Sequence, residues 1–380
     1  LTVLCLFSQC KKNDQPGDDD NSPAPTGNIT GRVVAANNTI PISLARVFID
    51  SDGKVYHTQT DINGQFTLTA PAGLQQLNIQ TGNGHMFRTT VNVTVKANET
   101  VTLPGTSVQL NQVANLAYIK GEYDKIEQLL IDTLGYAATE IHTYDFANIN
   151  NIKQYNAIYI NCSNHSVLQM NPQFDQVLAA YVANGGSLYT SDWAVNCLIG
   201  SVLYNQCPAA RPGGFLPDSL LCTRRTGPST IYPGSPVVSP TLMAYLNKPS
   251  ITVSFNLGSW EQVNIAHPAF WEIMVNSPSG EPLFIRSDKY SDNSRGTVNI
   301  GSPGNNNWVT ICHKPNGSNP VTLTIPQNAL AAHLAHGDAI GPCGNNDGSG
   351  QIYYTTFHNA HNGLIGPDVK NILQYMILNL

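Results

Sequence analysis

The feature that most constrains the fold is a change in hydrophobic period along the chain. Before about residue 105, apolar and polar residues alternate, as in Val91, Val93 and Val95 with polar residues between them. Alternation with a period of two is typical of β-strands that bury one face. From Leu116 onward, short apolar runs instead alternate with segments of helical spacing. The sequence therefore predicts two different folds in series.

The first segment has the pattern of an antiparallel β-sandwich. Turn residues recur about every ten positions between its strands, and in the motif TDINGQF at 60–66 Asp61 and Gly64 predict a tight turn. The stretch from Gly31 to Pro71, which contains this motif, resembles the carboxypeptidase regulatory-like family, a transthyretin-like β-sandwich. We expect a small all-β domain over residues 27–108. The resemblance implies a spacer or binding module.

The second segment predicts a three-layer, flavodoxin-like α/β domain with a mostly parallel sheet over residues 114–380. Apolar residues at helical spacing from Phe174 to Val182 predict a helix, and a last amphipathic helix carries Val369 and Ile372. Strands that alternate with helices indicate βαβ units whose sheet is covered on both faces. The predicted strands lie at 116–119, 157–160, 188–190 and 352–355.

Four pieces of this segment carry a family resemblance. The pieces YDKIEQLLIDTLG, YNAIYINC, YVANGGSLYTSDW and GQIYYTTFHNAHN resemble the class I glutamine amidotransferase-like superfamily. Catalytic members have a nucleophilic Cys at a strand-to-helix elbow and a His after a late strand. Here the elbow falls on or beside Ser191, and His358 lies where the His would be. Because no Cys occupies the elbow and its usual Gly residues are missing, we expect a degenerate site rather than an amidotransferase.

Polar residues follow each of the four strands, at 120–124, 161–163, 191–193 and 357–359. Sites in open α/β sheets lie beyond these carboxyl ends. Ser191, His358 and Asp192 supply the residue types for a nucleophile, a base and an orienting group. The alternative, which we favour, is that Ser191 and Asp192 cap a helix or pack at an inactive site. In that case Ser191→Ala and His358→Ala would leave the activity unchanged.

An unusual Cys/His-rich insertion occupies about residues 309–343. Thr324 to Gln327 read as a capping box, which predicts a helix that ends near Gly337 and places His333 and His336 on one face. The segment is similar to a short module that recurs in exported bacterial proteins. Its cysteine and histidine residues are Cys312, His313, His333, His336 and Cys343.

Two hypotheses for this insertion remain open. A disulfide between Cys312 and Cys343 would stabilise the fold by about 3–4 kcal/mol in the chain-entropy model. Alternatively, some of the five residues bind a transition metal, for which zinc is the candidate cofactor. A histidine-only site could coexist with the disulfide, with Asp338 as a further partner. We favour the disulfide, because an oxidising location stabilises it.

The N-terminal residues predict a membrane anchor. An apolar run from Leu1 to Phe7 precedes Cys10, which resembles a bacterial lipoprotein cleavage site at which Cys10 is acylated; Gln9 departs from the small residue usual there. Residues 1–10 are thus expected to be a signal segment, and residues 11–26 a disordered acidic linker. An ordinary signal peptide is the alternative. The acidic run at 18–20 resembles export signals of surface lipoproteins, so we expect an outer-membrane lipoprotein, with display at the cell surface as a further hypothesis.

Composition limits the possible partners. Charged residues make up 12% of the chain and the net charge is −6, with no basic cluster, so no footprint for nucleic acid is present. The Pro-rich stretch from 196 to about 310 is expected to form irregular excursions over the strand ends, which suit a ligand site. Six cysteines remain besides Cys5 and Cys10, and apart from Cys312 with Cys343 a local pair among Cys197, Cys207 and Cys222 is expected.

Together these features predict a non-catalytic cell-envelope lipoprotein that presents a binding surface to a glycan, a peptide or a partner protein. One alternative is an extracytoplasmic hydrolase that uses Ser191 and His358. A second alternative is a metal-binding module in the 309–343 insertion.

Overall fold

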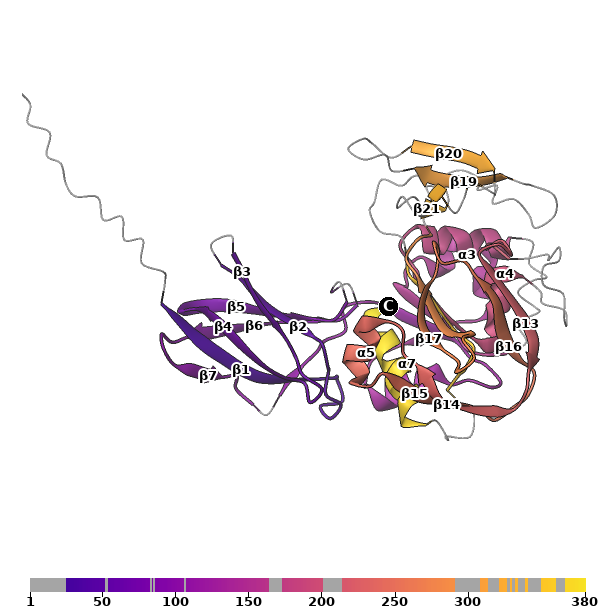
Figure 1. Ribbon diagram of the computed structural model, residues 1–380. Helices are drawn as coiled ribbons and strands as arrows, with labels where there is room; N and C mark the ends of the chain where they lie inside the picture. Colours follow the sequence, from indigo (N-terminus) through magenta and orange to yellow (C-terminus); the bar gives the residue numbers. More distant parts are fainter. Residues whose placement is uncertain are drawn as a thin grey trace, which may run out of the picture.

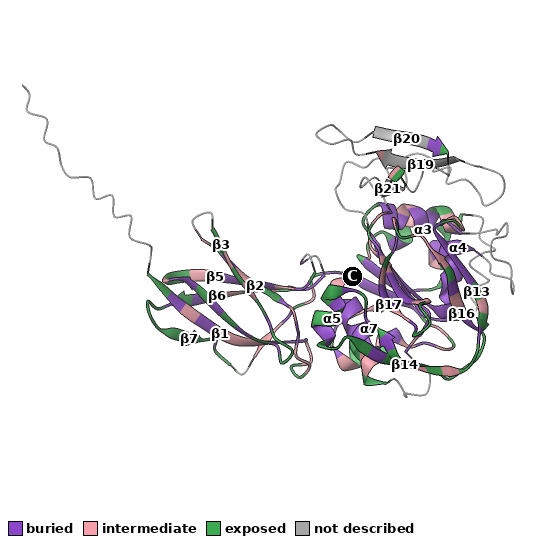
Figure 2. Ribbon diagram, in the orientation of Figure 1, coloured by how far each residue is buried: buried purple, intermediate pink, exposed green. Residues whose placement is uncertain are grey.

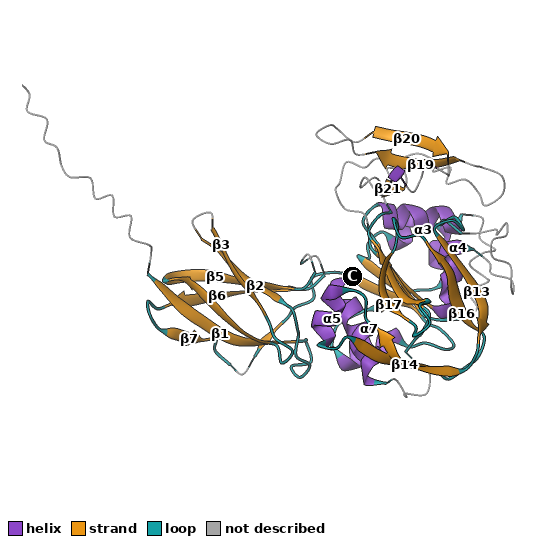
Figure 3. Cartoon of the chain, viewed as in Figure 1, coloured by secondary structure: helices purple, strands orange, loops and turns teal. Residues whose placement is uncertain are grey.

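The computed structural model shows a β-sandwich followed by an α/β domain (Figures 1 and 3). It describes residues 25–380 except 52–53, 83, 85, 106, 164–172, 201–213, 291–307, 314–320, 327–328, 330–331, 334–338, 341–349 and 360–365. Cys10 and most of the predicted linker at 11–26 lie outside the described residues. No helix in the described part of the chain is long and apolar enough to cross a membrane.

Two sheets form the sandwich, one mixed and one antiparallel. One has the order β4-β1-β7, with β8 also paired to β1, and the other has the order β3-β2-β5-β6. Alternate residues such as Ile29, Val47 and Leu68 are buried between them. The strands are β1 (Thr26–Val34), β2 (Arg46–Ser51), β3 (Lys54–Gln59), β4 (Gln65–Pro71), β5 (Gly73–Gln80), β6 (Arg88–Val95), β7 (Thr100–Thr102) and β8 (Val108–Gln109).

The turn predicted at 60–66 is confirmed. The Asp61 carboxylate accepts the backbone N–H groups of Asn63 at 2.9 Å and Gln65 at 2.8 Å. Gly64 has a φ of 74°, and Phe66 returns to the core. Asp61 therefore has a structural role in closing this turn.

The α/β domain is built on one sheet with the order β10-β9-β11-β12-β22-β18-β17. The first five strands are parallel, and the last two are antiparallel. The predicted strands at 116–119, 157–160, 188–190 and 352–355 are confirmed. The bounds are β9 (Leu116–Ile119), β10 (Thr139–Glu140), β11 (Ala157–Ile160), β12 (Ser187–Ser191), β17 (Glu272–Asn276), β18 (Pro282–Ser287) and β22 (Ile352–Thr355).

Both faces of this sheet are buried (Figure 2). On one face, tyrosines such as Tyr159 and Tyr189 share a core with α7 (Pro367–Asn379) and with the π-helix η1 (Gln128–Thr133). The residues that alternate with them, such as Ile160 and Leu188, share the second core with α3 (Phe174–Ala183). Short helices between Ile141 and Gly200 are η2 (Thr143–Ala147), α1 (Ile149–Ile152), η3 (Asp192–Val195) and α4 (Asn196–Ile199).

The sandwich and the α/β domain share a continuous apolar core. The ring centroids of Phe87 and Tyr136 are 4.4 Å apart, and the Tyr136 hydroxyl donates to the Leu110 carbonyl at 3.1 Å. Asn37 N donates to the Leu134 carbonyl at 3.0 Å. The sandwich is therefore packed directly against the α/β domain.

The prediction that 196–310 is irregular was wrong. Its described residues form the antiparallel pairs β13·β16 and β14·β15, with the second pair lying between β13 and β16 in sequence, and β17 and β18 extend the main sheet. Ile251, Val253 and Phe255 are buried at a period of two, a strand signal that the surrounding Pro and Gly residues obscured. The added elements are β13 (Leu221–Gly227), β14 (Thr230–Pro236), α5 (Pro240–Leu246), β15 (Ser250–Phe255) and β16 (Trp260–Ala266).

The insertion forms a small antiparallel sheet of order β20-β19-β21, made of β19 (Trp308–His313), β20 (Val321–Pro326) and β21 (Ala339–Ile340). The predicted capping box at 324–327 was wrong, because Thr324 to Pro326 end β20. Leu323 and Ile325 alternate with Thr residues, and this period of two outweighs the capping signal. The Cys312 side chain, His336 and Cys343 lie outside the described residues, so the predicted disulfide stays a prediction.

Candidate functional site

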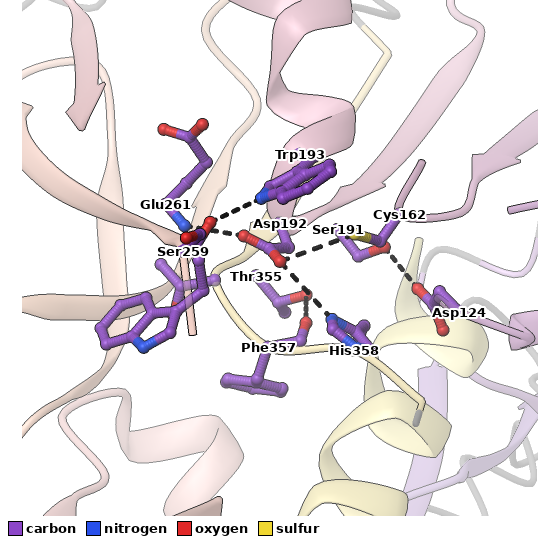
Figure 4. A network of polar contacts seen from close by, with 12 residues as sticks. Asp124, Cys162, Ser191, Asp192, Trp193, Ser259, Glu261, Thr355, Phe357 and His358 are labelled. Atoms are coloured by element: carbon purple, nitrogen blue, oxygen red, sulfur yellow. Dashed lines mark hydrogen bonds and ion pairs between the residues drawn. The ribbon is translucent and has the colours of Figure 1, made fainter. Parts of the chain in front are cut away.

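Polar side chains from four strand ends meet at one edge of the α/β sheet (Figure 4). Asp124 follows β9, Cys162 follows β11, Asp192 follows β12 and His358 follows β22. The carboxyl ends of neighbouring parallel strands lie at the same edge, so segments far apart in sequence converge there. The polar groups divide into two sets, one centred on Asp124 and the other on Asp192.

Asp124 is fully buried and saturated with hydrogen bonds. Its Oδ1 accepts the backbone N–H groups of Lys125 and Asn359, both at 2.8 Å. The Ser191 hydroxyl donates to its Oδ2. Burial outweighs these hydrogen bonds and raises the pKa of Asp124 to about 7. This set ties the ends of β9, β12 and β22 together.

Asp192 lies directly after β12, at the strand-to-helix elbow, with a φ of 44°. A positive φ is uncommon for a residue with a side chain and is found where surrounding contacts impose it. The Glu261 backbone N–H donates to its Oδ1 at 2.7 Å. Its Oδ2 lies 3.5 Å from Cys162 Sγ and 3.7 Å from His358 Nδ1. Among the described residues, these three side chains form a group whose ligand atoms lie close enough together to hold a metal ion.

Burial favours the neutral form of Asp192, Cys162 and His358 by shifting the pKa of each group. Desolvation raises the pKa of Asp192 and of the Cys162 thiol well above their usual values. Desolvation also lowers the pKa of His358 to about 4. At neutral pH the imidazole is therefore uncharged and has a nitrogen lone pair available.

Strands β13 and β16 supply the support behind Asp192. The Arg225 guanidinium donates to the buried Glu261 carboxylate at 2.8 Å, and the Thr223 hydroxyl donates to it at 2.7 Å. Arg225 also lies 4.1 Å from the centre of the Trp193 ring. The Trp193 indole N–H donates to the Ser259 carbonyl at 2.7 Å. These contacts fix Trp193 beside Asp192.

A cavity of about 320 Å³ opens above Asp192 and His358. Its walls combine aromatic rings with hydroxyl and amide groups, and one side is the connection from β15 to β16. The lining residues are Tyr123, Asp192, Trp193, Ser254, Phe255, Asn256, Leu257, Gly258, Ser259, Trp260, Phe357 and His358.

The structure brings only two of the three predicted catalytic residues together. Asp192 and His358 are neighbours at the base of the cavity. Ser191 is fully buried, its hydroxyl is engaged by Asp124, and it is not among the residues that line the cavity. The residue at the elbow is therefore Asp192, one position after Ser191.

Cys162 and Glu261 were not predicted as members of the site, and Asp124 was not predicted as part of the scaffold beside it. Asp124 and Cys162 lie in strand-end segments, a signal that the sequence does contain. Glu261 acts through its backbone N–H and lies in the region predicted to be irregular, so residue type gave no indication of its role.

The remaining predicted Cys and His residues are only partly described. The His313 and His333 rings lie edge to face with centroids 5.5 Å apart, which brings two of the predicted metal ligands together. Cys197 is a free, buried thiol, so it is not part of the expected local pair. Cys222 is disulfide-bonded, with a partner outside the described residues.

No family model and no curated protein matches the chain. Among solved structures, a DUF3823 family protein from Parabacteroides merdae is 19% identical over 24% of this chain, with a TM-score of 0.19, and the match spans about half (49%) of that protein. The 5-hydroxyisourate hydrolase of Klebsiella pneumoniae is 12% identical over 23% of this chain and 97% of its own, with a TM-score of 0.17. A ThuA-like protein from Bacteroides uniformis is 11% identical over 72% of this chain and 93% of its own, with a TM-score of 0.35. We infer no function from these likenesses.

Proposed function

We propose that the cavity above Asp192 and His358 binds a small carbohydrate, and that the protein presents this site at the cell envelope. The observation that carries the proposal is the composition of one cavity, in which aromatic walls stand over a carboxyl group and an imidazole. A volume of about 320 Å³ lies within the range of small-molecule sites.

A sugar ring combines the two surfaces that this cavity offers. Its C–H groups form apolar patches that can pack on aromatic rings, and its hydroxyl groups both donate and accept hydrogen bonds. Trp193 and Tyr123, whose ring centroids are 5.3 Å apart, supply aromatic surface. Asp192 and His358 supply polar partners at the base. A concave pocket of this size also favours a small ligand over a folded partner protein.

The cavity wall is prearranged for binding. Trp193 is fixed by its hydrogen bond to Ser259 and by the Arg225 guanidinium over its ring. A side chain that is already ordered loses little conformational freedom when the ligand arrives. The proposal thus requires no rearrangement of the sheet.

An array of labelled oligosaccharides tests this proposal, followed by titration of each hit with tryptophan fluorescence as the readout. We expect Tyr123→Ala to weaken binding by about tenfold, because it removes an aromatic wall. Tyr144→Ala is the matched control, since Tyr144 is 69% exposed and does not line the cavity. Equal effects of the two substitutions, or a lack of any hit, would contradict the proposal.

The elbow conformation of Asp192 supports a second candidate function, that of a hydrolase. Strained backbone residues cluster at active sites and cost on the order of 1–3 kcal/mol each. In this case Asp192 and His358 would be the acting residues, in place of Ser191. A panel of chromogenic glycosides and esters tests it: Asp192→Asn should abolish turnover, and Ser191→Ala should retain it.

We also propose that the α/β domain is flavodoxin-like and related to the class I glutamine amidotransferase-like superfamily. The five parallel strands β10, β9, β11, β12 and β22 follow the order 2-1-3-4-5 along the chain, which is one of the common doubly wound orders. The elbow at Asp192 further supports it.

The location at the outer membrane remains a proposal that rests on Cys10 and the acidic stretch after it. Metabolic labelling with an alkyne fatty acid in a bacterial host tests it. Wild-type protein should carry the label, and Cys10→Ala should not. Equal labelling of both would contradict acylation at Cys10.

A further inference from the structure

We propose that Cys162, Asp192 and His358 form a binding site for one transition-metal ion, and that zinc suits it best. The site lies at the base of the cavity. The inference does not depend on the carbohydrate proposal, because metal binding can be measured without any sugar.

The spacing of the three side chains fits such an ion. Each presents one ligand atom, and these atoms lie within 4.8 Å of one another. Asp192 Oδ2 is 3.5 Å from Cys162 Sγ and 3.7 Å from His358 Nδ1. Zinc bonds of about 2.3 Å to sulfur and about 2.0–2.2 Å to nitrogen and oxygen, at tetrahedral angles, separate the ligand atoms by about 3.4–3.6 Å. The two separations from Asp192 Oδ2 are close to these values, and the Cys162 and His358 ligand atoms lie within 4.8 Å of each other.

His358 provides an independent observation that points to a ligand. Its Nδ1 is buried and has no hydrogen-bond partner among the residues that the structure describes. The contact with Asp192 Oδ2 at 3.7 Å is too long for a hydrogen bond. A buried polar atom without a partner is unfavourable, because it has lost its hydrogen bonds to water and gained none. Coordination by Nδ1 would satisfy this atom, and Figure 4 shows the imidazole directed toward Asp192.

The charges around Asp192 also favour a cation. The neighbouring Arg225 guanidinium is paired with Glu261 at 2.8 Å, so its charge is already compensated. Asp192 itself faces a thiol and an imidazole, and it is 4% exposed. A buried carboxylate is stabilised when it coordinates a metal ion. A divalent ion at this point would add positive charge where that of Arg225 is already shared with Glu261.

The donor types distinguish between metals. A thiolate, an imidazole and a carboxylate together suit zinc and similar transition metals, whereas Mg²⁺ and Ca²⁺ prefer sites made of oxygen atoms. The Asp192 carboxylate is oriented by the Glu261 backbone N–H at 2.7 Å, and contacts of this kind behind the ligands hold them in place.

The ion would be reachable from the cavity. Asp192 and His358 line it, whereas Cys162 lies behind them and is 1% exposed. Three protein ligands with a further position open to a cavity are typical of catalytic zinc sites, whereas structural sites use four. An oxygen atom of water or of a bound ligand could occupy the open position.

The test uses the full chain after removal of metals with a chelator. In a titration with Zn²⁺ followed by calorimetry, we expect one equivalent to bind. Asp192→Asn and His358→Ala should each weaken binding by about 100-fold. In the Co²⁺-loaded wild type, a thiolate-to-cobalt charge-transfer band should appear, and Cys162→Ser should remove it.

Two controls make the test specific. Cys197→Ser changes another free, buried thiol and should retain the band. The double variant His313→Ala/His333→Ala separates this site from the insertion and should also retain it. Lack of Zn²⁺ binding by the wild type, lack of the band, or its persistence in Cys162→Ser would overturn the proposal. If Cys162→Ser does not fold, the double variant His313→Ala/His333→Ala decides. Loss of the thiolate-to-cobalt band in that variant would overturn the proposal, and retention of the band would support it.

Discussion

Asp124 and Asp192 are two buried carboxyl groups at the same edge of one sheet, yet their surroundings differ. Asp124 accepts two backbone N–H groups and the Ser191 hydroxyl, and it has no part in the cavity wall. Asp192 accepts one backbone N–H at 2.7 Å, and its other oxygen accepts a weak hydrogen bond from the Cys162 thiol at 3.5 Å and lies 3.7 Å from His358 Nδ1. Asp192 lines a cavity, and it has a positive φ.

This difference teaches that residue type and position at a strand end do not define a site. A carboxylate whose acceptor positions are filled by the protein has little capacity left for a ligand. A carboxylate with a poorly satisfied oxygen beside a cavity retains that capacity. We therefore assign Asp124 and Ser191 to the scaffold, and Asp192 and His358 to the site.

The largest expected effect is on stability at Asp124. Asp124→Ala leaves three buried donors without an acceptor, so we expect the free energy of unfolding to fall by about 3–5 kcal/mol. Asp124→Asn should be far milder, because its amide oxygen can still accept both backbone N–H groups. Urea denaturation followed by circular dichroism measures this. If Asp192→Ala costs as much as Asp124→Ala, the distinction between scaffold and site fails.

The second effect is the pH dependence caused by Asp124. Its pKa is raised from 3.8 to about 7 in the folded protein, so the folded state holds a proton that the unfolded state releases. The contribution of Asp124 to the free energy of unfolding is fully present below pH 3.8. It is lost as the pH rises toward 7, by at most about 1.4 kcal/mol per pH unit. Denaturation curves of Asp124→Asn should lack this loss. An identical slope in the wild type and the variant would show that Asp124 is not the cause.

The third effect has the opposite sign and comes from His358. Its pKa is lowered from 6.5 to about 4, so the unfolded state binds a proton first. Its contribution to stability is complete above pH 6.5 and is lost as the pH falls toward 4, over a narrower range than for Asp124. In the same denaturation series, His358→Gln should reduce the fall in the free energy of unfolding between pH 6.5 and 4. An unchanged fall in His358→Gln would mean that another group titrates there.

The smallest effect is expected for Ser191→Ala. The loss of one buried hydrogen bond should cost about 1 kcal/mol of stability. Carbohydrate binding should remain within about twofold of the wild type, since Ser191 does not line the cavity. His358→Ala, for which the sequence alone predicted equal neutrality, should now weaken binding. A stronger loss of binding in Ser191→Ala than in His358→Ala would return Ser191 to the site.

Much of this arrangement could be predicted from the sequence, because hydrophobic period marks strands and their ends. The segments that follow β9, β11, β12 and β22 were all identified as the place where polar groups would meet. The sequence could not decide between Ser191 and Asp192, because the elbow depends on a single backbone dihedral: Ser191 has a φ of −118° and Asp192 a φ of 44°.

Other parts of the site had no local signal. The contact between Asn359 N and Asp124 joins residues that are 235 positions apart. The Glu261 N–H that orients Asp192 is a backbone group, so its residue type carries no information. The position of the 196–310 stretch over the strand ends is as the sequence predicts, since Ser254 to Trp260 line the cavity. Its strands β15 and β16 were not predicted, because the Pro and Gly residues around them indicate irregular structure.

The most direct test of the difference between the two carboxyl groups is one paired titration. Asp124→Asn and Asp192→Asn change the same chemical group at the same sheet edge. Titrated with an oligosaccharide that the array identifies, with tryptophan fluorescence as readout, Asp124→Asn should bind within about twofold of the wild type. Asp192→Asn should bind at least about tenfold more weakly. Equal affinities of the two variants would contradict the assignment of Asp192 to the site.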